Sequence, residues 1–519
     1  MGAVETRQYW QNPLRGVRGA LGGPLFPLPL REGVGGGPDA PSPGVRFAHV
    51  RPLPQGEREY APNAPRTPLR LFGGTLLIFL AFYGGDGGYL DVREYLDDAQ
   101  RLWLKGDLRV SVDPPVYNRY ALGLPIVAGP FVYAGWLLSW ATGGAVSARG
   151  ITALAVPVLG AAAVALFFCW SMSLGCGARA ACWASLLFAF SSPVITYTQH
   201  FFTEELVLAC SLLAIWSFAQ AVRTGRSGCL LAAGAGLGFM PMAHNSSLPT
   251  TAALWSGMTV VLLLEQGPVG PRLRRVLLLT AVPVLAAGSM LYMNYSRYGS
   301  PFTSSYHAYY GAAAREFIRL AYIPRNLSVI GGWLLRTPWL APALALTVWL
   351  CWRGRSPLTL PSPPRGEGKQ SEWKLLLPVL AALAAQTFFW LCYRDLWITT
   401  YRYLLPLTGL WALGLPVAGQ WLERRFPVRG LAYTLIVFLM IGAACFMRDD
   451  GVRPFHTSIF TGALHCSTWY MEPATRRFQV GSPCGWVQGL TLVALLAGGC
   501  ILLARAWRLA GAHPEEQGG

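Results

Sequence analysis

Charged residues are scarce in this sequence of 519 residues, because Asp, Glu, Lys and Arg together make up only 13% of the chain. A typical soluble domain contains roughly 25% charged residues. Apolar and aromatic residues take their place, and the 53% of hydrophobic residues include 20 Trp, 21 Tyr and 24 Phe. The composition therefore excludes an ordinary soluble domain and predicts a membrane protein.

Acidic residues are the scarcer of the two charged kinds. The chain has 25 Asp and Glu against 42 Lys and Arg, which leaves a formal net charge of +17. A strong positive charge can indicate a nucleic-acid partner. Here, however, the Arg residues lie in short clusters between apolar runs, as they do in proteins whose charges set membrane topology. We therefore expect no nucleic-acid partner, and we interpret the basic residues as topology signals that also contact anionic membrane lipid.

The sequence has no C-x-x-C spacing, so its 11 Cys residues predict no metal site. Most of them lie within apolar runs, where a free cysteine behaves as a small hydrophobic residue. Cys466 and Cys484 differ, because both belong to a segment that we expect outside the cytoplasm, where a disulfide persists. Whether these two residues are bridged stays open, since a sequence does not show proximity.

Residues 1–68 contain no apolar segment of the kind found in a secretory signal peptide. They are rich in Gly, Pro and Arg, which predicts a disordered cytoplasmic tail. The segment 353–374 has a similar bias. We expect it to be a low-complexity cytoplasmic loop that carries no chemistry.

Apolar runs of the length that crosses a bilayer recur along the rest of the chain. They predict an all-α, polytopic integral membrane protein of about twelve transmembrane helices. The expected crossings are 69–86, 150–171, 180–196, 205–222, 228–244, 248–265, 275–294, 327–352, 375–393, 403–422, 430–447 and 486–504.

The basic clusters give these crossings an orientation, because Lys and Arg concentrate in cytoplasmic loops. With the crossings above, the clusters all fall on one side of the membrane. They are Arg70, Arg223/Arg226, Arg272/Arg274/Arg275, Arg353/Arg355, Arg424/Arg425/Arg429 and Arg505/Arg508. We therefore predict a multi-pass protein of the plasma (inner) membrane with both termini, including the tail 506–519, in the cytoplasm.

The long connections then lie on the extracytoplasmic side. The first of them, 86–149, is the longest, and 448–485 is the last. Within the first, the apolar run 122–141 is itself long enough to span the membrane, which would invert every later loop. Pro125 and Pro130 favour a broken helix that is embedded or re-entrant. Whether this run spans stays open.

The first extracytoplasmic loop begins with an acidic, amphipathic segment. From Asp91 onward apolar residues recur at spacings of three and four, and charged residues form the opposite stripe. That stripe consists of Asp91, Glu94, Asp98, Arg101 and Lys105. The pattern predicts an interfacial helix on the outer membrane surface. In the simplest interpretation Asp91 and Glu94 cap this helix, and the other charges are its solvated face.

Two features favour a function for the carboxylates instead. Asp91 follows the flexible GGDGG where the first crossing emerges, so a ligand has room to approach it. Glu204 and Glu205 begin another crossing with no basic residue nearby in the sequence. Carboxylates at membrane depth are costly, which makes these positions functional-site hypotheses. His200, close to this pair, is either a site residue or a hydrogen-bonded histidine at a helix end.

Several motifs then occur in the order found in one family of membrane enzymes. They are DVREYLDDA at 91–99 with GDL at 106–108, SSPVITYTQHFFTEEL at 191–206, NYSRYGSPFTSSY at 294–306, and YRYLLPLTGL at 401–410. In this order they resemble the polyprenyl-phosphate-sugar-dependent glycosyltransferases of the GT-C fold, glycosyltransferase family 39-like proteins that include the protein O-mannosyltransferases and the aminoarabinose transferase. The resemblance implies a GT-C-like transmembrane catalytic region over 69–422, followed by C-terminal transmembrane helices over 423–505.

The resemblance also implies an activity. Such an enzyme moves a sugar from a polyprenyl-phosphate donor to a hydroxyl of an extracytoplasmic glycan, lipid or protein, with inversion and with an Asp general base. By position, Asp91 is that base. Glu205, or Glu204 one residue earlier, takes the second acidic position, which orients the acceptor or, in metal-using relatives, holds a divalent cation. We see no cluster of residues that demands a metal.

Cationic side chains would stabilise the departing phosphate. Arg402 is the first candidate, and Arg394 and Arg297 follow it, because a guanidinium group suits phosphate oxygens. In the alternative interpretation, these arginines have no role in catalysis and anchor helices at the membrane interface. One departure from the family is that its frequent Asp-Glu pair reads Asp91-Val92 here.

Two other functions remain as alternatives. About twelve helices with both ends inside is also the layout of a multi-pass transporter, or of a flippase for a lipid-linked or small-molecule substrate. Such a protein would show two similar halves, which this sequence does not. A catalytically silent membrane scaffold is the third interpretation, and it would tolerate the loss of Asp91.

Overall fold

The computed structural model describes residues 66–83, 90–111, 116–118, 120–265, 267–304, 307–308, 317–353, 372–394, 402–426, 430, 432–437, 439–440 and 483–511. All of them belong to one compact unit, Pro62–Gly519. The expectations for residues 1–65, for most of the loop 353–374 and for 448–482, Cys466 included, lie outside the described residues.

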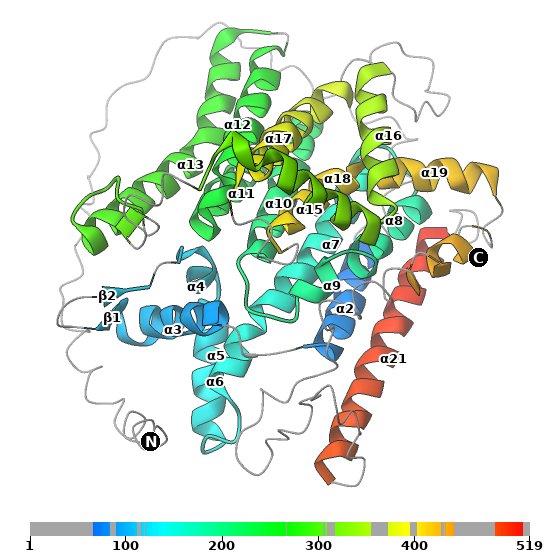
Figure 1. Ribbon diagram of the computed structural model, residues 1–519. Helices are drawn as coiled ribbons and strands as arrows, with labels where there is room; N and C mark the ends of the chain where they lie inside the picture. The colour runs from blue at the N-terminus through cyan, green and yellow to red at the C-terminus, as the bar shows by residue number, and fades with distance from the viewer. Residues whose placement is uncertain are drawn as a thin grey trace, which may run out of the picture. The chain divides into compact units, whose positions relative to one another are not determined.

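Within these residues the fold is all-α, as predicted, apart from one small antiparallel sheet of two strands (Figure 1). The strands are β1 (Arg109–Ser111) and β2 (Val116–Tyr117), with Arg109 opposite Tyr117. The α-helices are α2 (Arg66–Ala81), α3 (Leu90–Lys105), α4 (Gly123–Val127), α5 (Gly129–Ala141), α6 (Ala148–Ala153), α7 (Ala155–Ser173), α8 (Ala178–Phe190), α9 (Val194–Tyr197), α10 (Glu204–Thr224), α11 (Ser227–Ala243), α12 (Leu248–Leu263), α13 (Val269–Tyr298), α15 (Ile323–Arg336), α16 (Leu340–Arg353), α17 (Glu372–Cys392), α18 (Leu405–Trp411), α19 (Leu415–Arg425) and α21 (Pro483–Gly511). The 3₁₀ turns are η4 (Asn245–Ser247), η6 (Leu320–Tyr322), η8 (Arg402–Leu404) and η9 (Ala412–Gly414).

The described part contains six helices that are long and apolar enough to cross a membrane. They are Ala148–Ser173, Glu204–Thr224, Asn245–Leu263, Val269–Tyr298, Leu375–Cys392 and Leu490–Ala510. A seventh span arises if Leu320–Arg336 and Leu340–Leu346, which bend by 101°, are counted together. The protein is therefore a multi-pass membrane protein, while the described residues do not confirm the expected number of about twelve helices.

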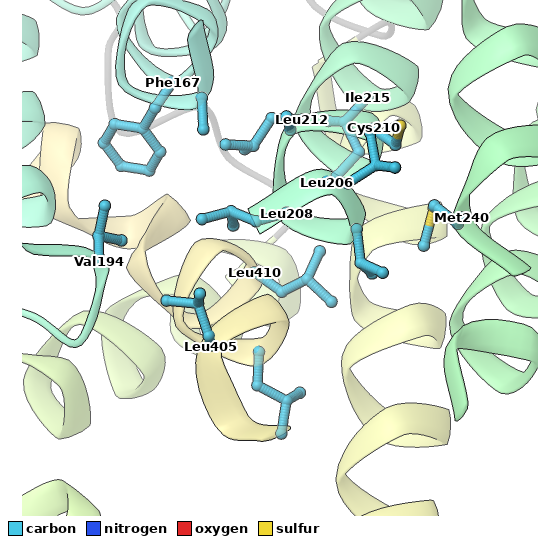
Figure 2. Close-up of a cluster of buried hydrophobic side chains, with 14 of the residues drawn as sticks. Phe167, Val194, Leu206, Leu208, Cys210, Leu212, Ile215, Met240, Leu405 and Leu410 are labelled. Carbon is cyan, nitrogen blue, oxygen red and sulfur yellow. The ribbon is translucent and has the colours of Figure 1, made fainter. Parts of the chain in front are cut away.

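Helix α10 lies in the interior of the fold. It is apolar all round, as expected of a helix with neighbours on every side, and it packs against α7, α11 and α18. Figure 2 shows this packing, in which Leu206, Leu208 and Leu212 of α10 lie among side chains that include Phe167 of α7 and Leu410 of α18. The buried surroundings hold the polar N-terminus of α10 in one place.

The first and last described helices, α2 and α21, pack side by side (Figure 1). Glycines allow the two backbones to approach closely, because a Cβ atom on Gly499 would lie 2.9 Å from the carbonyl oxygen of Gly74. Small residues serve the same purpose at many helix interfaces in membranes. Residues more than 400 positions apart thus complete one helix pair.

The apolar run 122–141 folds as two short helices, α4 and α5, with a break at Ala128. Pro130 lies in the first turn of α5, where a proline is tolerated. The broken helix that the prolines predicted is therefore confirmed. This segment packs against α3, since the Trp103 indole N–H donates to the carbonyl oxygen of Pro125 at 2.9 Å.

Helix α3 confirms the helix that the spacing predicts from Asp91 onward, but its apolar face packs on protein instead of lying on a membrane surface. Its apolar side chains Val92, Leu96 and Ala99 are fully buried and belong to the protein core. One assignment on the opposite stripe was wrong. Asp98, expected on the solvated face, is 0% exposed, because the segment around Asn118 and the end of α13 cover it.

Candidate active site

Several polar residues occur at helix ends that the fold brings to one side of the helix bundle. Helix α10 rises roughly 30 Å over its length, about the thickness of a bilayer core. It begins with Glu204, and α11 returns the chain to the same side, where His244 follows it. Helix α13 ends with Arg297 and Tyr298, and η8 begins with Arg402.

The opposite ends of these helices carry basic residues. Arg223, in the last turn of α10, donates to the carbonyl oxygen of Ser173 at the end of α7. Arg275, near the start of α13, donates to the carbonyl oxygen of Ala221 at 3.2 Å. These contacts place two of the predicted basic clusters at one side of the bundle, away from Glu204.

At the polar side, an arginine connects two carboxylates from distant helices. Arg402 Nη2 donates to Asp91 Oδ2 at 3.0 Å, and its Nε lies 2.9 Å from Glu204 Oε1. The contact to Asp91 is a hydrogen bond, whereas the angle at Nε makes the contact to Glu204 an ion pair without one. The side chain of Asp91 is 26% exposed, against 14% for Arg402 and 4% for Glu204. Asp91 is thus the most accessible member of the cluster.

Aromatic residues hold the cluster in place. The Arg402 guanidinium carbon lies 4.3 Å from the centre of the Phe202 ring and 5.1 Å from that of Tyr403. Guanidinium groups interact favourably with aromatic faces at such distances. The Tyr120 hydroxyl donates to Asp91 Oδ1, so the two oxygens of this carboxylate have different partners.

The structure separates the two glutamates that the sequence left as alternatives. Glu204 contacts Arg402, and Thr203 Oγ1 lies 3.4 Å from its Oε2. Glu205 is 0% exposed, and neither of its carboxyl oxygens has a hydrogen-bond partner among the residues that the structure describes. The geometry therefore favours Glu204 as the acidic partner of Arg402, although the alignment with the family motif favoured Glu205.

His200 lies beside the cluster, whereas Arg394 packs on a different segment. His200 is next to Phe202, with ring centres 5.8 Å apart, and Phe202 in turn supports Arg402. Arg394 lies over Phe317, with 4.4 Å from its guanidinium carbon to the ring centre, and its backbone N–H donates to the carbonyl oxygen of Phe317 at 2.8 Å. These contacts hold Arg394 against the segment before α15.

Arg297 joins a second polar group on another side of α3. Its Nη2 donates to the carbonyl oxygen of Asn118 at 2.5 Å, while Asn118 Nδ2 donates to Asp98 Oδ1 at 2.7 Å. Burial raises the pKa of Asp98 to about 7, and the positive charge of Arg297 opposes that rise. Asn118 therefore connects Arg297, at the end of α13, with Asp98 of α3.

The chain matches no known protein-family model, and no curated protein matches it significantly. Solved structures similar to it include the crystal structure of ArnT from Cupriavidus metallidurans bound to undecaprenyl phosphate. That likeness has 16% sequence identity and a TM-score of 0.47, and it covers 85% of this chain and 72% of ArnT. The archaeal oligosaccharyltransferase AglB from Archaeoglobus fulgidus, in complex with an inhibitory peptide and a dolichol-phosphate, has 10% identity and a TM-score of 0.44 over 74% of this chain and 56% of AglB.

The cluster does not fit a divalent-cation site. Arg402 occupies the position between the two carboxylates, where a cation would otherwise bridge them. Within the described ranges no group of three or more His, Cys, Asp or Glu side chains is arranged to hold a metal ion. Arg402 itself supplies the positive charge that Asp91 and Glu204 share.

Several residues of the site carry little or no signal in the sequence. Tyr403 lies in the motif YRYLLPLTGL, in which the resemblance implies a role only for its neighbour Arg402. Tyr120 and Phe202 carry no signal of their own, because an aromatic residue in an outer loop is common in any membrane protein. His244 ends an apolar run and follows a helix, which is the one local feature that distinguished it.

Proposed function

We propose that this protein is an inverting membrane glycosyltransferase, which moves a sugar from a polyprenyl-phosphate donor to a hydroxyl outside the cytoplasm. The observation that carries the proposal is the Arg402 guanidinium held between Asp91 and Glu204. Three residues that belong to separate motifs of the resemblance meet there, one each on α3, α10 and η8. A passive interfacial helix would not require this meeting.

Asp91 suits the role of general base. Its side chain is 26% exposed, and a carboxylate accepts about four hydrogen bonds, so the contacts to Tyr120 and Arg402 are compatible with accepting a proton. In the proposed step the acceptor hydroxyl gives its proton to Asp91, and its oxygen forms a bond to the anomeric carbon. The bond from that carbon to the phosphate oxygen breaks, and its electron pair leaves with the polyprenyl phosphate.

Arg402 is suited to stabilise the departing phosphate. Its Nη2 and Nε face Asp91, Tyr403 and Glu204, whereas its Nη1 has no hydrogen-bond partner in the described part of the chain. A guanidinium group that is anchored on one edge presents its remaining N–H groups in a defined direction. Negative charge that develops on the phosphate would be stabilised by these donors.

A transfer assay tests the proposal. Membranes that contain the protein receive a panel of undecaprenyl-phosphate-linked sugars, and release of undecaprenyl phosphate is followed by chromatography. We expect release from at least one donor, and none with the Asp91→Asn variant. Movement of an intact lipid-linked sugar across vesicle bilayers, without release of the lipid phosphate, would instead establish a flippase.

The position of the site relative to the cytoplasm is tested separately. Arg93 of α3 and Arg226 before α11 are both exposed. In a cysteine-free background, Arg93→Cys should react with an impermeant thiol reagent in intact cells, and Arg226→Cys only after lysis. The reverse labelling would place the site at the cytoplasmic face and contradict the proposed acceptor location.

A further inference from the structure

His244 lies at the proposed active site and belongs to a hydrogen-bond network, but it stands outside every motif of the resemblance. It follows α11, where its backbone N–H donates to the carbonyl oxygen of Met240 at 3.0 Å, and its backbone is extended. Its ring lies beside Tyr403, with ring centres 5.5 Å apart. Tyr403 also lies beside Arg402, so His244 and Arg402 both contact the same aromatic ring.

A chain of hydrogen bonds fixes one nitrogen of the His244 ring. Nδ1 lies 3.3 Å from the backbone N–H of Ser246 and 2.6 Å from its hydroxyl oxygen. The carbonyl oxygen of Ser246 accepts from Gln386 Nε2 at 3.2 Å, and Gln386 Oε1 accepts from the hydroxyl of Thr250. Gln386 and Thr250 are buried, with 2% and 3% of their surfaces exposed. The network therefore connects the histidine to α12 and α17.

This arrangement decides where the neutral ring carries its proton. A backbone N–H can only donate, so Nδ1 of His244 is an acceptor and the proton resides on Nε2. Across the described residues Nε2 has no hydrogen-bond partner, and the residue is half-buried. The site thus contains one oriented N–H donor that no protein group uses.

The surroundings of His244 are charged on several sides. Burial lowers the pKa of His244, the carboxylates of Glu204 and Asp91 raise it, and the guanidinium of Arg402 lowers it. Tyr403 faces it from η8, and Ser246 faces it from η4. Because burial dominates, the ring is neutral near pH 8 and donates from Nε2 without a charge of its own.

We infer that His244 is a further substrate-binding residue, whose Nε2–H donates a hydrogen bond to a phosphate oxygen of the polyprenyl phosphate that Arg402 holds. The inference rests on the proposed function, because it needs a lipid phosphate at Arg402. It adds a neutral donor beside the same Tyr403 ring that the guanidinium contacts. Phosphate oxygens accept several hydrogen bonds, so the two donors are complementary.

The test compares two substitutions of different chemistry. His244→Gln keeps an N–H donor at a similar reach, while His244→Leu removes it. Binding of undecaprenyl phosphate, undecaprenol and inorganic phosphate to the purified full chain is measured at pH 8 by native mass spectrometry. We expect His244→Leu to weaken undecaprenyl phosphate binding about 10- to 100-fold, the range for a lost hydrogen bond to a charged group. His244→Gln should retain most of the affinity.

The other ligands separate the outcomes. Undecaprenol binding should be unchanged in His244→Leu, because the alcohol lacks the phosphate, and inorganic phosphate should compete with the lipid only if headgroup contacts suffice for binding. Equal losses for both lipids would assign His244 a structural role and overturn the inference. Unchanged undecaprenyl phosphate binding in His244→Leu would overturn it as well, and would leave the proposed function intact.

A control and a second failure complete the test. His307 also has a serine hydroxyl at Nδ1, Ser304 Oγ at 3.1 Å, but it is exposed, so His307→Leu should bind undecaprenyl phosphate like the wild type. If the wild-type protein binds no undecaprenyl phosphate at all, the proposed function itself fails. That result is distinct from a failure of His244 alone.

Discussion

Asp91 and Arg402 are 311 positions apart in the chain, yet Arg402 Nη2 donates a 3.0 Å hydrogen bond to Asp91 Oδ2. The aspartate begins a loop helix, and the arginine begins the turn that leads into α18. The same guanidinium contacts Glu204 at the start of an interior helix. Arg402 therefore joins three segments at one point and gives Asp91 a cationic neighbour. The proposed chemistry depends on this arrangement.

Replacement of the proposed base should slow transfer strongly without unfolding the protein. We expect Asp91→Asn to lower the rate of sugar transfer by roughly 100- to 10,000-fold, the usual contribution of a general base. The matched control is Asp97→Asn on the same helix, because Asp97 pairs with Arg149 at a site where both side chains are 38% exposed. Such exposed pairs contribute little. Comparable loss in both variants would argue for disturbance of α3 rather than for catalysis.

Loss of the central arginine should affect stability as well as activity. Arg402→Gln leaves the nearly buried Glu204 without its cation, and breaking a buried ion pair from one side costs about 3 to 5 kcal/mol. The double variant Arg402→Gln with Glu204→Gln should regain much of this stability but no transfer activity. Thermal unfolding in detergent measures the first effect, and undecaprenyl phosphate release the second. Additive destabilisation in the double variant would mean that the two side chains do not interact.

The two neighbouring glutamates should respond differently to the same substitution. Glu204→Gln removes the charge that faces Arg402 and should reduce transfer substantially. Glu205→Gln replaces a fully buried carboxyl that has no hydrogen-bond partner in the described chain, and an amide is less costly to bury than a charge. We therefore expect Glu205→Gln to retain transfer and stability. If Glu205→Gln reduced transfer more than Glu204→Gln, the alignment with the family motif that gives Glu205 the second acidic position would be correct instead.

Asp98 should make the stability of the protein depend on pH. Burial raises its pKa in the folded protein to about 7 from an ordinary value of 3.8. Between these two pH values the folded state binds more protons than the unfolded state. The stabilisation of the folded state by the proton on Asp98 is therefore complete below about pH 4 and is lost as the pH rises through 7. The loss is at most about 4 kcal/mol.

Substitution of the same residue by asparagine should remove this dependence. Asp98→Asn keeps an oxygen that accepts from Asn118 and cannot ionise. In detergent we expect the variant to have a higher apparent Tm than the wild type at pH 8 and a similar one at pH 4. Asp97→Asn, next to it but exposed, serves as the control. A lower Tm of Asp98→Asn at pH 8 would show that the native protein uses the charged form.

Local sequence patterns predicted the elements of this fold well, since they depend on neighbours in the chain. Apolar length predicted the six described helices that are long and apolar enough to cross a membrane, although the number of about twelve is not confirmed. A spacing of three and four predicted α3, and two prolines predicted the break between α4 and α5. The same patterns could not predict the partners of α3. Its apolar face packs on the protein core, and Asp98 is buried, because the segment around Asn118 and the end of α13 cover it.

The sequence by itself determined the candidate residues: Asp91 and the Glu204/Glu205 pair as carboxylates at membrane depth, and Arg402 from a motif of the resemblance. Only the tertiary structure decided that Glu204, and not Glu205, faces Arg402, since neighbours at a helix start point in directions about 100° apart. It also decided that His244 belongs beside them. Its place depends on hydrogen bonds to Ser246 and Gln386 across three segments, and no local pattern encodes an interaction over that separation.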